Sequence, residues 1–94
     1  MNEIVCLRIK ISGMVQGVGF RYQLRKTAIS LGLSGWVRNN ADGSVSALIQ
    51  GRKDKVLDLV DWSRKGPAMS MVTSVDIEEK SVDHELTGFN IVFR

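Results

Sequence analysis

The order of apolar patterns along the chain predicts an α+β fold. Period-two alternation, typical of half-buried strands, and helical spacing follow one another as β-α-β-β-α-β, with a short alternating segment last. This is the order of the split βαβ, or ferredoxin-like, sandwich. Right-handed crossovers would place the two helices on one face of a mostly antiparallel sheet. We expect one domain over residues 1–94, which is long enough to bury a single core.

The first strand spans residues 4–12, in which apolar and polar side chains alternate. Its outward positions begin with Cys6, which we expect to be a thiol at the surface or the edge of the sheet. Helical spacing follows, and Gly32 is well placed to end this helix. The apolar stripe of the helix consists of Phe20, Leu24, Ala28 and Leu31.

The second and third strands form a predicted hairpin over residues 33–39 and 44–50. The segment that connects them is rich in turn formers, and its Asp-Gly pair is a strong hairpin signal. A second helix is expected over about residues 54–65, where Val56, Leu59 and Val60 form the inward stripe. Gly66 and Pro67 end it.

The last part of the chain contains two further strands. Residues 72–79 read as the fourth, with Val75 and Ile77 inward, and residues 80–88 form a polar loop. Phe89, Ile91 and Phe93 alternate in the short final strand. The uncovered face of the sheet should then carry Cys6, Arg8, Lys10, Trp36, Arg38, Ser46 and Leu48 to solvent or to a partner.

The overall composition favours a small protein of a reducing compartment. Cys6 is the only cysteine, so no intrachain disulfide can form. The chain starts without the basic segment and apolar run of a signal peptide, and no apolar run reaches transmembrane length. The net charge of +3 suits either an anionic small molecule or nucleic acid. We therefore expect a cytoplasmic protein without a membrane partner.

The segment from Gly13 to Arg21, between the first strand and the first helix, is the most informative stretch. Gly17 and Gly19 permit unusual backbone angles, so main-chain amides can approach a ligand closely. A bend of this kind at a helix N-terminus can direct several N–H groups toward one anion. Arg21 lies in the first helical turn, where a cation opposes the helix dipole unless an anion lies between them. Guanidinium matches phosphate oxygens, so a phosphate cradle is favoured over a plain connector.

Asn39, at the end of the second strand, allows two interpretations. In the structural one, it hydrogen-bonds only its own backbone at the start of the turn. In the functional one, the end of this strand converges on the glycine-bearing loop. A neutral carboxamide can then accept a hydrogen bond from a water and donate one to an oxyanion.

Two motifs give the chain a resemblance to a known family. Residues 13–21 resemble the acylphosphatase signature G-x-V-Q-G-V-x-F-R, and residues 35–45 resemble the second signature, G-W-V-[RK]-N-x-x-D-G-x-V. The resemblance covers essentially the whole chain. Departures are minor, with Ala68 where a second proline is frequent and Ser70 where alanine is frequent. They lie away from the expected site.

The resemblance implies hydrolysis of the carboxyl–phosphate anhydride of an acyl phosphate. Arg21 would bind the phosphate and Asn39 would orient the attacking water. The side chain of Gln16 is expected to shape the loop without binding the phosphate. Backbone amides would cradle the phosphoryl oxygens, contributed by Val15, Gln16, Gly17, Val18, Gly19 and Phe20.

The expected chemistry needs no cofactor and no metal. Phosphoryl transfer with a good carboxylate leaving group depends mostly on positioning and charge stabilisation. No His or Cys cluster has metal-ligand spacing, and no carboxylate pair adjoins the loop. We expect a monomer that acts on a small acyl phosphate and binds no nucleic acid.

Two alternatives stay open. One is a module of the same fold that binds nucleic acid or another anion without catalysis, although only Trp36 offers a stacking aromatic on the uncovered face. The other is a module of a larger assembly, acting for example on carbamoyl phosphate.

Overall fold

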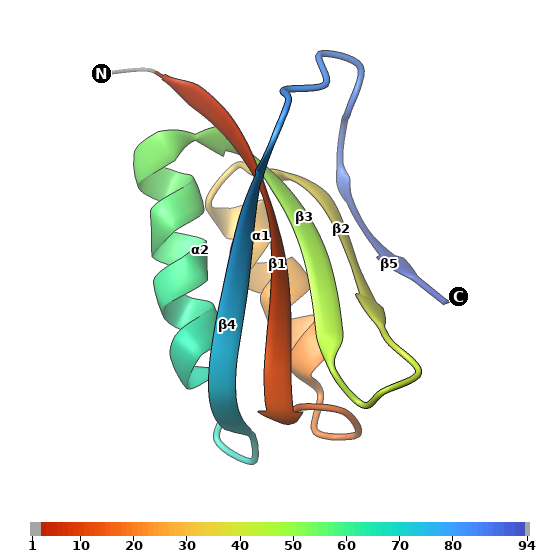
Figure 1. The fold of residues 1–94 in the computed structure, drawn as a ribbon. Helices are drawn as coiled ribbons and strands as arrows, with labels where there is room; N and C mark the ends of the chain where they lie inside the picture. The colour runs from red at the N-terminus through yellow and green to blue at the C-terminus, as the bar shows by residue number, and fades with distance from the viewer. Residues whose placement is uncertain (1–2, 94) are drawn as a thin grey trace.

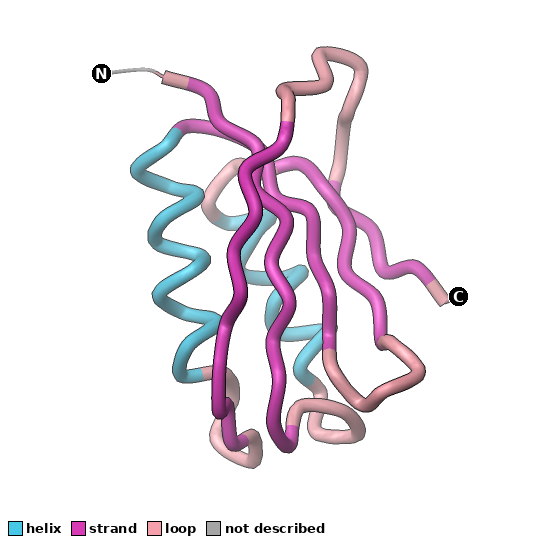
Figure 2. The backbone as a smooth tube through the Cα atoms, in the orientation of Figure 1, coloured by secondary structure: helices cyan, strands magenta, loops and turns pink. Residues whose placement is uncertain are grey.

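The computed structural model describes residues 3–93 and contains one five-stranded sheet and two helices (Figures 1 and 2). Residues 1–2 and 94 of the predicted domain lie outside the described part. The elements are β1 (Ile4–Met14), α1 (Phe20–Ser30), β2 (Ser34–Asn39), β3 (Val45–Arg52), α2 (Lys53–Lys65), β4 (Met71–Lys80) and β5 (Phe89–Val92).

The sheet has the strand order β4-β1-β3-β2-β5. Antiparallel pairs join β1 to β3 and β4, and β2 to β3, whereas β5 runs parallel to β2. Both helices lie on the same face of this sheet, as Figure 1 shows. The predicted ferredoxin-like sandwich with a short C-terminal strand is therefore confirmed.

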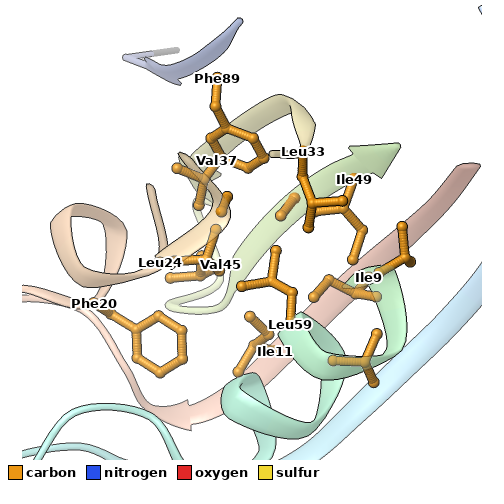
Figure 3. Close-up of a cluster of buried hydrophobic side chains, with 14 of the residues drawn as sticks. Ile9, Ile11, Phe20, Leu24, Leu33, Val37, Val45, Ile49, Leu59 and Phe89 are labelled. Atoms are coloured by element: carbon orange, nitrogen blue, oxygen red, sulfur yellow. The ribbon is translucent and has the colours of Figure 1, made fainter. Parts of the chain in front are cut away.

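The core lies between the sheet and the two helices (Figure 3). Phe20, Leu24 and Ala28 of α1 are buried, as the sequence predicts. The ring of Phe20 meets Trp62 of α2 edge to face, with 5.5 Å between the ring centroids. Burying a side chain as large as Leu or Phe stabilises the fold by about 1.5–3 kcal/mol. Phe20 therefore anchors the first turn of α1, in which Arg21 lies.

The end of α1 is closed by a reciprocal pair of backbone hydrogen bonds. The N–H of Gly32 donates to Ile29 O at 3.0 Å, and the N–H of Leu33 donates to Ala28 O at 3.0 Å. This is the Schellman arrangement, which satisfies carbonyls that a helix end leaves free. The predicted role of Gly32 is confirmed, and the chain turns directly from α1 into β2.

The prediction that Cys6 is exposed is wrong. Its side chain is only 2% exposed, although it lies on the sheet face that the helices leave uncovered. Gln50, the cross-strand partner of Cys6, exchanges two hydrogen bonds of 2.8 Å with the backbone of Asp83. These bonds tie the segment after β4 to that face beside Cys6. Burial, and then the nearby Asp83 carboxylate, raise the pKa of the Cys6 thiol.

Two further residues differ from expectation in exposure, although each lies on the predicted face of the sheet. Ser46 is buried, because the side chain of Asn40 reaches over the sheet face and donates to Ser46 Oγ at 2.7 Å. Ile77 is exposed, because β4 is an edge strand that pairs only with β1. Lys10 is exposed and Trp36 is half-buried, as predicted for this face.

Among residues 3–93, no helix has the length and apolar character needed to cross a bilayer.

Candidate active site

The loop between β1 and α1 holds two glycines in the left-handed region, Gly17 with a φ of 76° and Gly19 with a φ of 77°. A Cβ added at either position would meet nothing within 4 Å. Glycine is therefore needed for the backbone angle and not for packing, and the space beside the loop is open.

The backbone amides of this loop have no acceptor within the described part of the chain. None of the N–H groups of residues 15–19 donates to another backbone or side-chain group there. The first N–H groups of a helix likewise have no intrahelical partner, which adds Phe20 to the set. Free amides beside open space form a site that suits an anion.

Arg21 is half-buried in the first turn of α1. That turn contains no acidic residue, and Gly19 at the N-cap supplies no side-chain cap. None of the ion pairs between described residues includes Arg21. Its guanidinium lies 5.2 Å from the ring centroid of Phe93. Among residues 3–93, no carboxylate therefore pairs with this cation or with the positive end of the helix, and both face the site.

Asn39 is the last residue of β2, and its Oδ1 is buried without a hydrogen-bond partner among the described residues. Other residues, and not Asn39, make the hydrogen bonds that stabilise the turn that follows. Asn40 donates to Ser44 Oγ at 2.8 Å, and Asp42 Oδ1 accepts from the Ser44 backbone at 3.0 Å. The interpretation that Asn39 serves the turn is therefore wrong. Its carboxamide is available to a ligand or a water.

The loop and Asn39 meet in a hollow of about 170 Å³, which we call the cradle hollow. A hollow of this size has room for a phosphoryl group with one water. Gln16 and Val18 belong to the same loop but do not line it. Its lining residues are Val15, Gly17, Gly19, Phe20, Arg21, Tyr22 and Asn39.

Gln16 joins the loop to the hairpin that carries Asn39. Its Nε2 donates to Asn40 O at 2.8 Å and to Ser44 O at 2.9 Å. The sequence predicts a shaping role for this side chain but gives no signal for its partners, which lie in another element. The two bonds fix the distance between the anion-binding loop and the end of β2.

Asp42 is the carboxylate nearest to Asn39 in sequence, and its partners are structural. Hydrogen bonds from Ser44, and then the ammonium of Lys10, hold the pKa of the Asp42 carboxyl well below its usual range. Lys10 Nζ lies 2.9 Å from Asp42 Oδ2. A carboxylate held ionised in this way is a weak proton acceptor, so Asp42 serves the hairpin and not the reaction.

The site has the chemistry of an oxyanion receptor with a place for water. The cradle hollow combines one permanent cation, several free amides and a carboxamide, and its lining includes no Asp, Glu or His. Within residues 3–93, no group of three His, Cys, Asp or Glu side chains gathers where a metal ion would bind.

Sequence reasoning missed a second hollow that adjoins this one. The side hollow, of about 380 Å³, shares Arg21 and Asn39 with the cradle hollow. Asn40, Ala41, Val92 and Phe93 complete its lining. No motif marks Phe93, because its contact with Arg21 arises only when β5 joins the sheet beside β2.

Comparisons with known proteins agree with this chemistry. The sequence model of the family described as acylphosphatase matches residues 7–91. A protein of Acaryochloris marina described as an acylphosphatase is 47% identical over 92 residues, which are 98% of each chain. Among solved structures, an acylphosphatase from Coxiella burnetii matches with a TM-score of 0.90 at 36% identity, covering 97% of this chain and 94% of its own.

The fold also matches a part of a larger protein. Full-length HypF, solved in a phosphate- and nucleotide-bound form, matches with a TM-score of 0.88 at 29% identity. The match covers 98% of this chain but only 12% of the HypF chain.

Proposed function

The chain belongs to the acylphosphatase family, and from this premise we propose that Arg21, Asn39 and the amides of residues 15–20 perform its reaction. The reaction is hydrolysis of the carboxyl–phosphate anhydride of acyl phosphates to a carboxylate and inorganic phosphate. The observation that carries the proposal is the cradle hollow, which Arg21 and Asn39 both line. Among the described residues, the Arg21 guanidinium has no ion-pair partner and the buried Asn39 Oδ1 has no hydrogen-bond partner.

The phosphoryl group binds in the cradle hollow. Its non-bridging oxygens accept hydrogen bonds from the loop amides and from the planar fork of Arg21. These donors are fixed before the substrate arrives, so they stabilise the charge of the transition state at little cost in reorganisation. They supply the positive potential that phosphoryl transfer requires.

Asn39 orients the attacking water. Its Oδ1 accepts a hydrogen bond from the water, and its Nδ2 donates to the phosphoryl group. The water oxygen forms a bond to phosphorus while the bond from phosphorus to the acyl oxygen breaks. The carboxylate leaves with the bonding electrons, and a phosphoryl oxygen takes the proton of the water. Because the leaving group is a stable anion, no general acid is needed.

The decisive experiment is Arg21→Ala, assayed with benzoyl phosphate in the presence of EDTA. We expect kcat/KM to fall on the order of a hundredfold to a thousandfold, the usual cost of losing one preorganised oxyanion contact. Arg21→Lys keeps the charge but loses the fork, and should recover only part of the activity. Lys26→Ala removes one positive charge from the same helix outside both hollows and is the matched control. Unchanged turnover in Arg21→Ala would refute the assignment.

Asn39→Ala separates the orientation of water from the binding of substrate. Kcat should fall much more than KM rises, because a positioned water contributes only on the way to the transition state. A change confined to KM would make Asn39 a binding residue instead.

The wider setting is part of the same proposal. The single domain predicted for residues 1–94 is sufficient for activity and acts as a cytoplasmic monomer without a nucleic-acid partner. Light scattering after size exclusion checks the monomer. A gel shift with ribo-oligonucleotides at micromolar protein, if one were observed, would restore the nucleic-acid alternative.

A further inference from the structure

Phe93 follows the last strand of the sheet, and burial does not explain its position. Its side chain is 77% exposed, which is unusual for a large aromatic residue. It nevertheless contacts one residue of the site, because the guanidinium of Arg21 lies over its ring at 5.2 Å from the centroid. Both residues line the side hollow.

Arg21 needs a positioning contact. Among residues 3–93, the arginines whose side chains donate hydrogen bonds are Arg25 and Arg52, and no ion pair includes Arg21. An unrestrained arginine has about 2 kcal/mol of rotamer entropy. In the empty site, the positive end of α1 would also repel its charge. Both effects would turn the guanidinium away from the cradle hollow.

An aromatic ring suits this task better than a carboxylate does. The face of the ring attracts the cation through its quadrupole, whereas the N–H donors of a guanidinium lie in the plane of that group. A contact with the face of the ring therefore restrains the guanidinium and leaves free the donors that must bind phosphate. A carboxylate at the same place would occupy those donors and neutralise the charge.

We propose that Phe93 is a positioning residue, whose ring holds the Arg21 guanidinium at the mouth of the cradle hollow. This rests on the proposed function, because it assigns Arg21 to the phosphoryl group. Inorganic phosphate, the reaction product, would bind to the same Arg21 guanidinium and loop amides. Its affinity therefore reports on Phe93 without the chemical step.

The test compares Phe93→Leu with Phe93→Tyr. Leucine keeps an apolar side chain but lacks the ring, so kcat/KM for benzoyl phosphate should fall about threefold to tenfold and the inhibition constant of phosphate should rise equally. Tyrosine keeps the ring and should leave both values unchanged. Trp36→Leu is the matched control, because it removes the ring that Arg8 and Arg38 flank on the opposite face of the sheet.

A double-mutant cycle shows whether Phe93 acts through Arg21. In an Arg21→Ala background, Phe93→Leu should cost nothing further in kcat/KM, because the group that it positions is absent. An equal loss in both backgrounds, or equal losses for Tyr and Leu at position 93, would overturn the proposal. An Arg21→Ala variant as active as wild type would instead refute the proposed function, so the two failures are distinguishable.

Discussion

Asn39 and Asn40 are adjacent but have opposite surroundings. The side chain of Asn40 makes two hydrogen bonds, to Ser44 Oγ and Ser46 Oγ, whereas Oδ1 of Asn39 has no partner in the described chain. Neighbouring asparagines can thus serve stability and chemistry separately. The division follows from the strand period, because successive side chains point to opposite faces of the sheet.

This contrast gives a prediction for the paired variants. Asn39→Ala removes no side-chain hydrogen bond between residues 3–93, so the free energy of unfolding should change by less than about 0.5 kcal/mol while turnover falls. Asn40→Ala removes a hydrogen bond to the buried hydroxyl of Ser46 and should lower the free energy of unfolding by about 1–3 kcal/mol. Urea denaturation of both variants checks this. A loss of stability in Asn39→Ala as large as that in Asn40→Ala would contradict it.

Cys6 predicts a pH dependence of stability. Burial raises the pKa of its thiol in the folded state above the ordinary value of 9.0. The unfolded state therefore ionises first as pH rises. The neutral thiol therefore makes its full contribution to the free energy of unfolding below pH 9, and this contribution declines as pH rises through the folded-state pKa. The difference in unfolding free energy between pH 8 and pH 10 should be smaller in Cys6→Ala than in wild type.

A thiol reagent provides an independent check on Cys6. Because the side chain is buried beside the segment after β4, modification in the native protein should follow local or global opening. Rapid labelling at pH 8 without denaturant would contradict the buried position.

At the scale of elements, the active site is the junction of a loop and a hairpin. Gln16 connects them, because its carboxamide nitrogen donates hydrogen bonds to two carbonyl groups of the hairpin. Catalysis requires the amides of the loop and the carboxamide of Asn39 to keep a fixed separation. This separation is therefore set by an interaction between elements and not by either motif alone.

Gln16→Ala should accordingly weaken both stability and turnover. The loss of two partly buried hydrogen bonds costs about 1–3 kcal/mol. A displacement of Asn39 by about 1 Å can lower kcat as much as a hundredfold. The affinity for inorganic phosphate should change less, because Arg21 and the amides remain. Full kcat in Gln16→Ala, measured below its melting temperature, would contradict the inference that the Gln16 hydrogen bonds position Asn39.

At the scale of the whole molecule, binding and stability are linked. A ligand that binds only the folded state stabilises it by about 2.7 kcal/mol at a hundred times its dissociation constant. For a domain of this size, each kcal/mol raises Tm by roughly 4–8 °C. Inorganic phosphate should therefore raise the Tm of wild type and of Asn39→Ala, but not that of Arg21→Ala. Equal shifts in all three proteins would indicate binding elsewhere.

The sequence predicts the fold well, because each element carries its own periodicity. The helical stripes of α1 and α2 and the alternation of β1 are local patterns, and the structure agrees with them. Cys6 is the instructive exception. Its burial depends on the hydrogen bonds between Gln50 and the backbone of Asp83. The alternation of apolar and polar residues in a strand cannot predict a contact between segments so distant in sequence.

The candidate site could be predicted only in part. The glycine-bearing loop and the end of β2 are visible as motifs, and the structure brings them together. The partners of Gln16 and the contact between Phe93 and Arg21 join segments that are distant in sequence. They depend on register and strand order, because β5 must pair with β2 before its end reaches α1.

The position of β5 has a consequence for temperature. The anion-binding loop extends from β1, which is paired on both sides, whereas Phe93 follows a four-residue edge strand paired only with β2. Fraying at such an edge needs far less free energy than global unfolding. Warming would thus release the aromatic support of Arg21 while the core persists, and activity would decline some degrees before the circular dichroism signal does.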